Sequence, residues 1–505
     1  MTLHFQDSMP IAERVCLMNI IIENGLICTA TDHFVGDIVI TGDTITAITA
    51  PHAARQTVGS GTNNSPAEQE FQTVVPIKDQ GTDYEIIDAT GHYVVPGGID
   101  PHTHFDLQQS PKHRACDDFL HGGIAAACGG TTTIIDHIAF GPAGCSLHHQ
   151  FDVYRDLAKD CPVDYSFHGV FQHVDDSILK EINELVTKEG FPSFKAYTTY
   201  GSPMHEPELF ALLERLKKCG GLLTVHAEDD TITNTLRNRL TKEELLPIGH
   251  ALTRPNTAES ISVNTVIGLA RVVGDAPVYL VHMSAHESLS EIRLARQEGQ
   301  ANIYAETCPQ YLFLTDDKFK DGGPMESIKY MLAPPLRKKE DQDALWQGLQ
   351  DGTVQVVATD HCPFTIAEKQ AYVDDFRNCP GGISGVEERM PLLFSEGVLQ
   401  KRLTPEQFVQ VTATNAARIF GITNKGDIKV GYDADLVLFN PNESRTFRAD
   451  NLKTTCGYSA YEGMTVNATV AKVFLRGQLI AENNTFCGKK GYGQLLKRHV
   501  KAADK

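Results

Sequence analysis

The sequence contains no apolar run as long as the ~18 residues that a membrane-spanning helix requires. Its first 19 residues also differ from a secretory signal, because Asp7 and Glu13 interrupt the region where such a signal is apolar. We therefore expect a cytoplasmic protein that has no membrane contact.

Closely spaced cysteines are missing as well. The 12 cysteines are scattered along the chain, and none forms a C-x-x-C pair. This spacing argues against a zinc finger and against a dense disulfide framework. We expect most of the thiols to be reduced and buried.

Basic residues are outnumbered, with 45 Lys and Arg against 64 Asp and Glu, which gives a formal net charge of −19. A nucleic-acid-binding protein needs a basic surface to displace counterions, so we expect no nucleic acid partner. The composition, 41% hydrophobic and 22% charged, is typical of a globular protein. At 505 residues the chain exceeds the usual single core, unless most of it closes into one large α/β barrel with a smaller second domain.

Both ends of the chain have β-structure patterning. Short β-branched runs separated by turn signals fill 19–49 and 85–95, with a polar insertion at about 51–84 between them. Similar runs return at 425–441 and 470–482. We therefore predict a discontinuous β-sandwich domain made of residues 1–95 and 428–480, followed by a C-terminal tail, 481–505.

Residues 96–427 alternate short apolar strands with helical stretches, as repeated βα units do. Eight such strands indicate an α/β fold with a closed, TIM-like (β/α)8 barrel. The predicted strands are 97–104, 131–137, 164–170, 192–198, 221–227, 277–283, 301–307 and 354–360.

Residues of metal-binding type stand at the carboxyl ends of five predicted strands, where barrels of this kind build active sites. His102 and His104 share one strand face, because side chains alternate with a period of two. A single histidine at a strand end is more often structural, and we leave His137, His168 and His361 in that class. Imidazoles together with a carboxylate are the ligands that Zn²⁺ favours, and the candidates are His102, His104, Lys195, His226, His282 and Asp360.

Several longer motifs extend this pattern. From about residue 19 to 490 the chain resembles the dihydropyrimidinase and D-hydantoinase family of the amidohydrolase superfamily. The motifs that carry the resemblance are PGGIDPHTHF (96–105), ACGGTTTIIDH (127–137), SFKAYTTY (193–200), VHAED (225–229), VHMS (281–284), ETCPQYL (306–312), PPLR (334–337), ATDHCPF (358–364) and GVEERM (385–390).

The resemblance implies a site with two divalent metal ions, expected to be zinc. His102, His104 and Asp360 would bind one ion, and His226 and His282 would bind the other. Lys195 would bridge both ions. An ammonium group cannot ligate a cation, so this role requires N6-carboxylysine at Lys195.

The same resemblance implies a reaction and its catalytic residues. Two metal ions lower the pKa of a water and polarise the carbonyl of a cyclic amide, which is a poor electrophile. Asp360 would take the proton and return it to the ring nitrogen, and Tyr200 would donate a hydrogen bond to the oxyanion. The expected activity is hydrolysis of dihydropyrimidines or 5-substituted hydantoins to N-carbamoyl amino acids by a homotetramer.

The chain departs from the family pattern in the expected substrate-binding set of Tyr200, Ala333 and Gly381. Ala333 stands where a serine is common, and residues 380–382 read Pro-Gly-Gly where an asparagine turn is common. We expect Ala333 and Gly381 to hold the ring amide through backbone groups.

Three alternative functions stay open. A dihydroorotase normally has an arginine just after His-x-His, whereas Phe105 and Asp106 follow here. An allantoinase would share the Gly-Gly-Ile at 381–383. A non-catalytic assembly or signalling relative would lack metal ligands, and this chain keeps all six.

Overall fold

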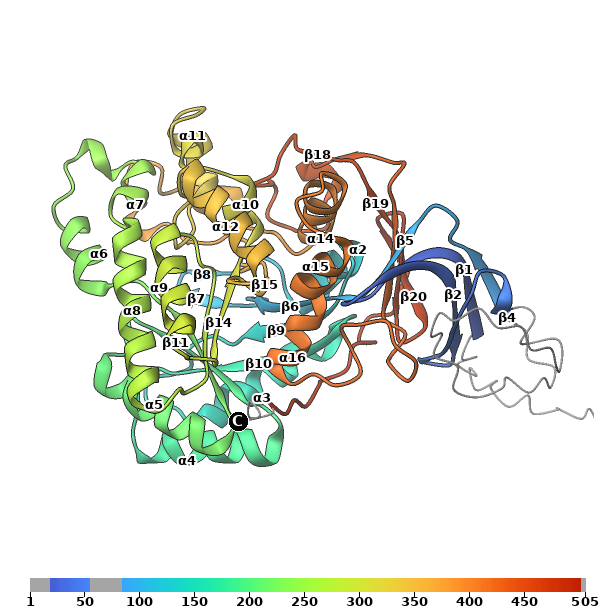
Figure 1. Ribbon diagram of the computed structural model, residues 1–505. Helices are drawn as coiled ribbons and strands as arrows, with labels where there is room; N and C mark the ends of the chain where they lie inside the picture. Colours follow the sequence, from blue (N-terminus) through green and yellow to red (C-terminus); the bar gives the residue numbers. More distant parts are fainter. Residues whose placement is uncertain (1–18, 55–83, 501–505) are drawn as a thin grey trace, which may run out of the picture.

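The computed structural model describes residues 19–54 and 84–500. Within these residues the chain forms an eight-stranded parallel barrel and a separate nine-stranded sheet (Figure 1). The sheet combines the first strands of the chain, coloured blue, with the last strands, coloured red, beside the barrel.

The barrel strands follow one another in space in their order along the chain. A parallel bridge between Thr103 and His361 brings the last segment back to the first, and the backbone N–H of His104 donates to the carbonyl of His361 at 2.9 Å. The predicted TIM-like barrel is therefore confirmed. Its strands are β6 (Gly98–Thr103), β9 (Thr131–His137), β10 (Asp164–Val170), β11 (Ser193–Tyr197), β12 (Leu222–His226), β13 (Val278–Leu280), β14 (Ile303–Thr307) and β15 (Val356–Val357).

Two barrel strands are shorter than the sequence predicts. The predicted strand 277–283 ends at Leu280, and the predicted strand 354–360 is regular only at Val356–Val357. His282 has φ 42° and Asp360 has φ 56°, so both residues adopt the left-handed conformation. This conformation takes the backbone out of the extended ladder at both positions.

Helices cover the outside of the barrel, and α5 (Glu206–Cys219) shows why they form. Its leucines recur at 209, 212, 213 and 216, so they face the core on one stripe. Gly220 ends the helix at φ 80°. The other helices of eight or more residues are α2 (Phe119–Cys128), α3 (Leu147–Leu157), α4 (Asp176–Glu184), α6 (Asp230–Arg237), α8 (Asn256–Val272), α9 (His286–Gln297) and α12 (Lys339–Asp351).

Shorter helices complete this layer. The predicted helical stretch near 405–420 is α15 (Pro405–Val409) and α16 (Asn415–Phe420), joined by a π-helical turn. The remaining short helices are α7 (Ile248–Leu252), α10 (Pro309–Phe313), α11 (Pro324–Ser327), α13 (Ile366–Gln370) and α14 (Arg389–Leu393).

The second sheet joins the two ends of the chain. Strand β16 runs antiparallel to β5, with Leu438 opposite Val94, so the predicted discontinuous β-domain is confirmed. Residues 55–83 of the predicted insertion lie outside the described residues, and the predicted domain boundaries stay predictions. The strands are β1 (Asn19–Cys28), β2 (His33–Thr41), β3 (Thr44–Thr49), β4 (Tyr84–Asp88), β5 (Tyr93–Pro96), β16 (Leu436–Asn440), β19 (Thr469–Leu475), β20 (Gln478–Glu482) and β21 (Thr485–Phe486).

Two short hairpins lie outside both sheets. One pairs β7 (Gln108–Ser110) with β8 (His113–Arg114), and the other pairs β17 (Arg445–Thr446) with β18 (Thr465–Val466). The first follows β6 directly and contributes to the active-site cavity described below.

The C-terminal segment packs against the barrel of its own chain. The backbone N–H of Leu496 donates to the carbonyl of Tyr165 at 2.7 Å. The guanidinium of Arg498 is fully buried and donates to Ser166 and to the carbonyl of Phe167. This part of the predicted tail therefore closes the foot of the barrel, the end opposite the carboxyl ends of the strands.

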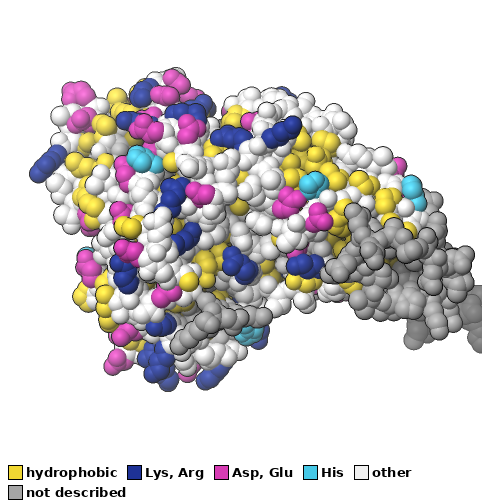
Figure 2. Space-filling model, viewed as in Figure 1, with side chains coloured by type: hydrophobic (Ala, Val, Ile, Leu, Met, Phe, Trp, Pro, Cys, Tyr) yellow, Lys and Arg dark blue, Asp and Glu magenta, His cyan; other side chains and the backbone are white. Residues whose placement is uncertain are grey.

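Surface and thiol chemistry agree with the composition. No helix among the described residues is long and apolar enough to span a membrane. The 11 described cysteines are free thiols, and six of them are buried. On the face seen in Figure 2, Lys and Arg side chains lie among Asp and Glu side chains.

Candidate active site

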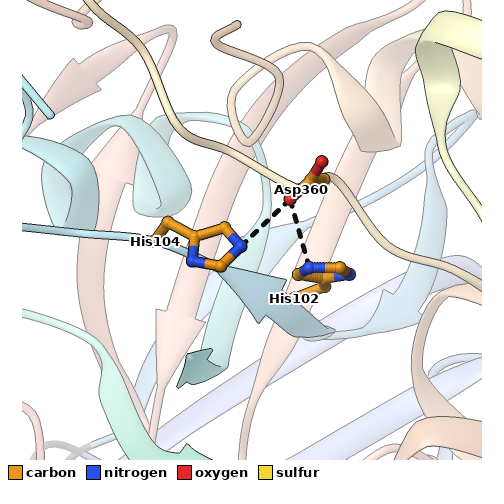
Figure 3. A group of neighbouring side chains, drawn as sticks. All are labelled: His102, His104 and Asp360. Atoms are coloured by element: carbon orange, nitrogen blue, oxygen red, sulfur yellow. Dashed lines mark ion pairs between the residues drawn. The ribbon is translucent and has the colours of Figure 1, made fainter. Parts of the chain in front are cut away.

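Three predicted ligands meet at the carboxyl end of the barrel (Figure 3). His102 and His104 extend from β6, and Nε2 of each ring lies 3.1 Å from Oδ1 of Asp360. The three ligand atoms lie within 4.8 Å of one another, so one metal ion could contact all of them. Burial alone would raise the pKa of Asp360, but the charge of His102 and the hydrogen bonds from both histidines lower it well below its usual range.

His226 and His282 form a second group next to the first. Nδ1 of His226 lies 2.8 Å from Nε2 of His282, and the rings of His102 and His282 stack at 5.5 Å. Burial lowers the pKa of His226 and His282, so both imidazoles are neutral at neutral pH. Neutral imidazoles carry the lone pair that a metal ion needs.

Lys195 lies between the histidines. Its Nζ is 3.5 Å from Nε2 of His102, and the side chain is 1% exposed. Burial lowers the pKa of Lys195 from 10.5 to about 8. The uncharged amine is therefore far more abundant at neutral pH than it is for a lysine in water.

Two buried carboxylates orient the histidines from behind. Nδ1 of His102 hydrogen-bonds to Glu306, and Nε2 of His226 lies 2.8 Å from Oε2 of Glu228. Each carboxylate fixes its ring by accepting the proton of the nitrogen that it contacts, so the other ring nitrogen is the one that would ligate a metal ion in place of a proton. These nitrogens face Asp360 and His282, so the donor set fits a divalent cation such as zinc.

Tyr200 lies beside this group in a strained conformation. Its ring is 4.9 Å from that of His226 and 5.2 Å from the guanidinium of Arg254. Its φ of 77° is left-handed, like those of His282 and Asp360, and strain of this kind persists where the surrounding structure holds it. The residue is 42% exposed, and an ordinary phenol, with a pKa of about 10, remains a hydrogen-bond donor at neutral pH.

A cavity of about 860 Å³ opens over the ligand group. Tyr200, Ala333 and Gly381 all line it, as the substrate-binding prediction requires. Gly381 is held by the hairpin that follows β6, because the Gln109 side chain donates to its carbonyl at 2.8 Å and accepts from its N–H at 3.1 Å.

Comparison with known proteins places this geometry in a family. The model of the Amidohydrolase family matches residues 93–480. The chain belongs to the amidohydrolase family. It is 45% identical over 421 residues to a D-phenylhydantoinase of Escherichia coli K12, covering 82% of this chain and 90% of that relative.

Two solved structures are similar in fold to this amidohydrolase. A dihydropyrimidinase from Brevibacillus agri NCHU1002 superposes with a TM-score of 0.87 at 36% identity, covering 96% of this chain and all of that one. A D-hydantoinase from Bacillus sp. AR9 gives a TM-score of 0.86 at 35% identity, covering 95% and 99%. The predicted family and enzyme class are confirmed, and the roles of individual site residues stay predictions.

The histidines left as structural in this amidohydrolase have different surroundings. His361 lies 3.1 Å from Asp117 and accepts the backbone N–H of Gly385, and Nε2 of His168 contacts the carbonyl of Pro101 at 3.0 Å. His137 stacks on His168 at 4.2 Å, and neither of its ring nitrogens has a hydrogen-bond partner among the described residues. None of the three lines the cavity.

Sequence reasoning missed Glu228, Glu306 and Arg254. Glu228 follows His226 by two residues, so the spacing alone places both on one face. Glu306 stands at the end of a predicted strand, which is the signal that located the metal-ligand candidates. Arg254 follows no strand, and only the structure reveals its ion pair with Glu228.

Proposed function

We propose that this amidohydrolase hydrolyses the cyclic amide bond of dihydropyrimidines or 5-substituted hydantoins to give N-carbamoyl amino acids. The observation that carries the proposal is the convergence of His102, His104, Lys195, His226, His282 and Asp360 beneath a cavity that Tyr200 lines. The relatives that support this substrate class are a D-phenylhydantoinase, a dihydropyrimidinase and a D-hydantoinase.

The proposed cofactors are two zinc ions and a carboxylated Lys195. His102, His104 and Asp360 would hold one ion, His226 and His282 the other, and Lys195 both. An ammonium group 3.5 Å from a metal-ligand nitrogen would repel a cation, whereas a carboxylated lysine is an anionic ligand. The lowered pKa of Lys195 favours the uncharged amine that carbon dioxide must react with. When bound, the ions would lower the pKa of a water and polarise the scissile carbonyl.

Asp360 is proposed to move the proton. Like an ordinary aspartate it is ionised at neutral pH, so its free carboxylate oxygen can accept a proton from the attacking water. Its strained backbone fixes the carboxylate between His102 and His104. Asp360 would then return the proton to the ring nitrogen that leaves.

Tyr200 is proposed to stabilise the oxyanion. The phenol keeps its proton at neutral pH, as a tyrosine ordinarily does, and the guanidinium of Arg254 packs against its ring. A donor aimed at charge that develops only in the transition state lowers the barrier selectively. Backbone groups at Ala333 and the carbonyl of Gly381 would hold the ring amide. The N–H of Gly381 is already bonded to Gln109, and its carbonyl oxygen keeps a second lone pair.

The surroundings of Phe105 and Asp106 disfavour dihydroorotase activity. Phe105 is buried against Phe119, and Asp106 pairs with Arg114 at 2.7 Å. Neither position offers a free cation for a carboxylate on the ring. Allantoin remains the second candidate substrate, because Gly381 and Gly382 line the cavity.

We also propose a cytoplasmic homotetramer. The tail from residue 481 would contribute contacts to a neighbouring subunit, although its residues near 496 pack on their own barrel. Light scattering at micromolar concentration should give the mass of four chains. A monomer under these conditions would contradict the proposal.

A turnover panel tests the proposed reaction. Zinc-reconstituted protein is assayed with dihydrouracil, 5-phenylhydantoin, allantoin and dihydroorotate. We expect ring opening of the first two and no appreciable hydrolysis of dihydroorotate. Faster turnover of allantoin or dihydroorotate would overturn the proposed substrate class, and no turnover with Zn²⁺, Mn²⁺ or Co²⁺ would favour a non-catalytic relative.

A further inference from the structure

The lining of the active-site cavity is divided between apolar and cationic residues. The apolar part includes Leu107, Ile138, Phe140, Val170 and Met331. The polar part comes mainly from one face of α6 and from the segment after α7, and it includes Thr233, Asn234, Arg237, Thr253 and Arg254. Lys112 of the hairpin and Arg377 also line the cavity.

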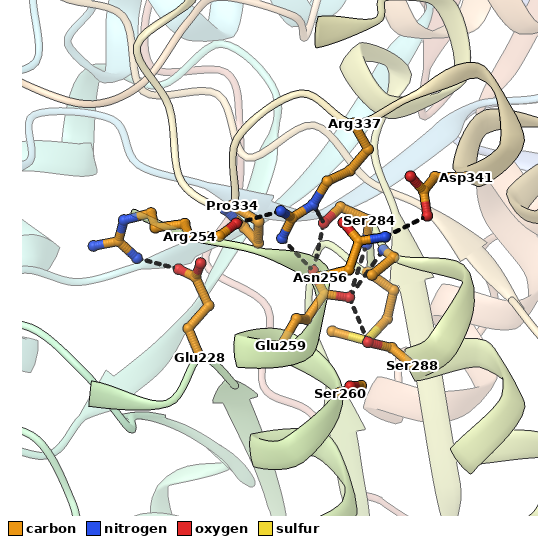
Figure 4. Close-up of polar contacts among 12 residues, drawn as sticks. Glu228, Arg254, Asn256, Glu259, Ser260, Ser284, Ser288, Pro334, Arg337 and Asp341 are labelled. Carbon is orange, nitrogen blue, oxygen red and sulfur yellow. Dashed lines mark hydrogen bonds and ion pairs between the residues drawn. The ribbon is translucent and has the colours of Figure 1, made fainter. Parts of the chain in front are cut away.

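Cationic side chains outnumber carboxylates in this lining. Arg254 pairs with Glu228 (Figure 4), and Arg377 pairs with Asp375 at 2.6 Å. Arg237 forms no ion pair with any carboxylate in the part of the chain that the structure describes. Among the described cavity residues Asp360 is the single carboxylate, and it belongs to the predicted metal ligands.

Arg237 is held in place but keeps donors free. Its Nη2 donates to the carbonyl of Arg377, which anchors the guanidinium at the cavity wall. Burial and the positive charges of Arg254 and Arg377 lower the pKa of Arg237 and outweigh the opposing effect of Asp375, which is paired with Arg377. A guanidinium has five N–H donors, and those that remain match a carboxylate in a bidentate arrangement.

We propose that Arg237 recognises a carboxylate at the end of the substituent on the substrate ring. The inference deepens the proposed function and rests on it: the ring is held at Asp360 and Tyr200, and the substituent extends along the wall toward Arg237. A cavity of about 860 Å³ is large enough for a drug-sized ligand, so it accommodates more than the bare ring.

The position of the carboxylate matters as much as its charge. Arg254 contacts the Tyr200 ring, and Arg237 lies near enough to Arg254 to be affected by its charge. The recognised carboxylate therefore stands on a flexible chain that reaches past Tyr200. We expect a carboxylate bound directly to the ring, as in dihydroorotate, to fall short of Arg237.

A matched pair of hydantoins tests this specificity. One carries a 2-carboxyethyl group at C5 and the other the isosteric 2-carbamoylethyl group, so the pair differs in charge and not in size. We expect the wild-type kcat/KM to be at least about tenfold higher for the acid. Arg237→Gln should reduce this acid-to-amide ratio at least about tenfold, because it removes the charge.

Two further variants separate charge recognition from structural damage. Arg237→Lys keeps the charge but loses the fork geometry, so it should restore part of the ratio. Arg239 is exposed and does not line the cavity, so Arg239→Gln makes the same charge change nearby and should leave the ratio unchanged. Raising the salt concentration should reduce the ratio for wild type and not for Arg237→Gln.

Calorimetric binding of the acid and the amide gives a second measurement that does not depend on turnover. If neither hydantoin is opened, the proposed function fails, while tighter binding of the acid that is lost in Arg237→Gln still supports the cationic subsite. A wild-type ratio of one or less would overturn the inference. So would an equal loss for acid and amide in Arg237→Gln.

Discussion

Two buried lysines at opposite ends of the barrel, Lys425 next to the foot and Lys195 at the rim, have different surroundings. Next to its foot, Nζ of Lys425 lies 2.9, 2.8 and 2.7 Å from carboxylates of Asp164, Asp433 and Asp435, which raise the pKa of the lysine above its usual range. At the rim, Lys195 is equally buried but has no such carboxylate cage, and its pKa falls to about 8. A cage of carboxylates therefore keeps Lys425 charged, whereas burial without such a cage makes the uncharged amine of Lys195 accessible at neutral pH.

Left-handed backbone conformations occur at several functional and structural positions. Tyr200, His282 and Asp360 at the rim all have positive φ. Next to the foot, Arg476, which pairs with Asp164, also has a positive φ, of 46°. Left-handed residues therefore occur at both ends of the barrel, and three of them lie at or beside the predicted ligands.

Removing the lysine at the rim should have the largest effect. Lys195→Ala should lose most bound metal and activity, because an anionic bridge between two cations disappears. Acetate or propionate at high concentration should restore part of both by occupying the space. Metal analysis and turnover measure the loss and the rescue.

Lys369 offers a matched control for this variant. It is also fully buried, with a pKa lowered to about 8 by burial, but its Nζ donates to the backbone carbonyl of Met331 at 2.8 Å. Lys369→Ala should keep its metal and show no rescue by acetate. A Lys195→Ala protein with both ions and a near-normal rate would remove the bridging role.

Asp360→Asn should separate metal binding from proton transfer. An amide cannot accept the proton from water, so kcat should fall by about 10²-fold or more. Much of the metal should stay bound, because His226 and His282 do not depend on this carboxylate. Retention of the wild-type rate would exclude Asp360 as the base.

Lys425→Met tests the foot of the barrel. The change leaves the buried carboxylate of Asp435 without its cation and removes one of the two cations beside Asp164, so it should lower the free energy of unfolding by about 3–5 kcal/mol in urea denaturation. The folded variant should still bind two ions. Lys429→Met is the control, because Lys429 is half exposed and pairs only with Asp427, so its loss should be below about 1 kcal/mol. Loss of metal from folded Lys425→Met would show that the metal site depends on the ion pairs next to the foot of the barrel.

A smaller effect is expected at Glu388, a buried carboxyl outside both regions. Burial and then the charge of Glu387 raise its pKa from 4.5 to about 8. The folded protein keeps this proton up to about pH 8, whereas the unfolded chain releases it above about pH 4.5, so stability falls as pH rises between these values.

Glu388→Gln should remove that pH dependence. The variant should be more stable than wild type by about 1–3 kcal/mol at pH 8, and the gain should shrink toward pH 5. The matched Glu387→Gln should instead destabilise, since Glu387 pairs with Arg445 at 2.7 Å. A constant difference between Glu388→Gln and wild type across this range would show that Glu388 does not carry the proton.

Much of the fold and of the site could be predicted from the sequence, because the alternation of side chains along strands determines both. Alternation along each strand places His102 with His104, and the parallel barrel brings the strand ends together. The support of His102 by Glu306 requires barrel closure over 204 positions, which no local pattern encodes. The early ends of β13 and β15 depend on left-handed residues that follow apolar runs, so periodicity alone predicts longer strands.

The C-terminal segment and the cationic wall were not predictable for another reason. Leu496 and Arg498 bind the barrel through backbone carbonyls, and such partners leave no sequence signature. Arg237 and Arg254 come from the segment between β12 and α8, whose path over the cavity is set by tertiary contacts.

Metal content of the purified wild-type protein tests the central claim most directly. If His102, His104, Lys195, His226, His282 and Asp360 hold a two-ion site, elemental analysis should find about two divalent ions per chain, with zinc predominant. Less than one ion per chain, with no activity regained on adding Zn²⁺, Mn²⁺ or Co²⁺, would contradict it.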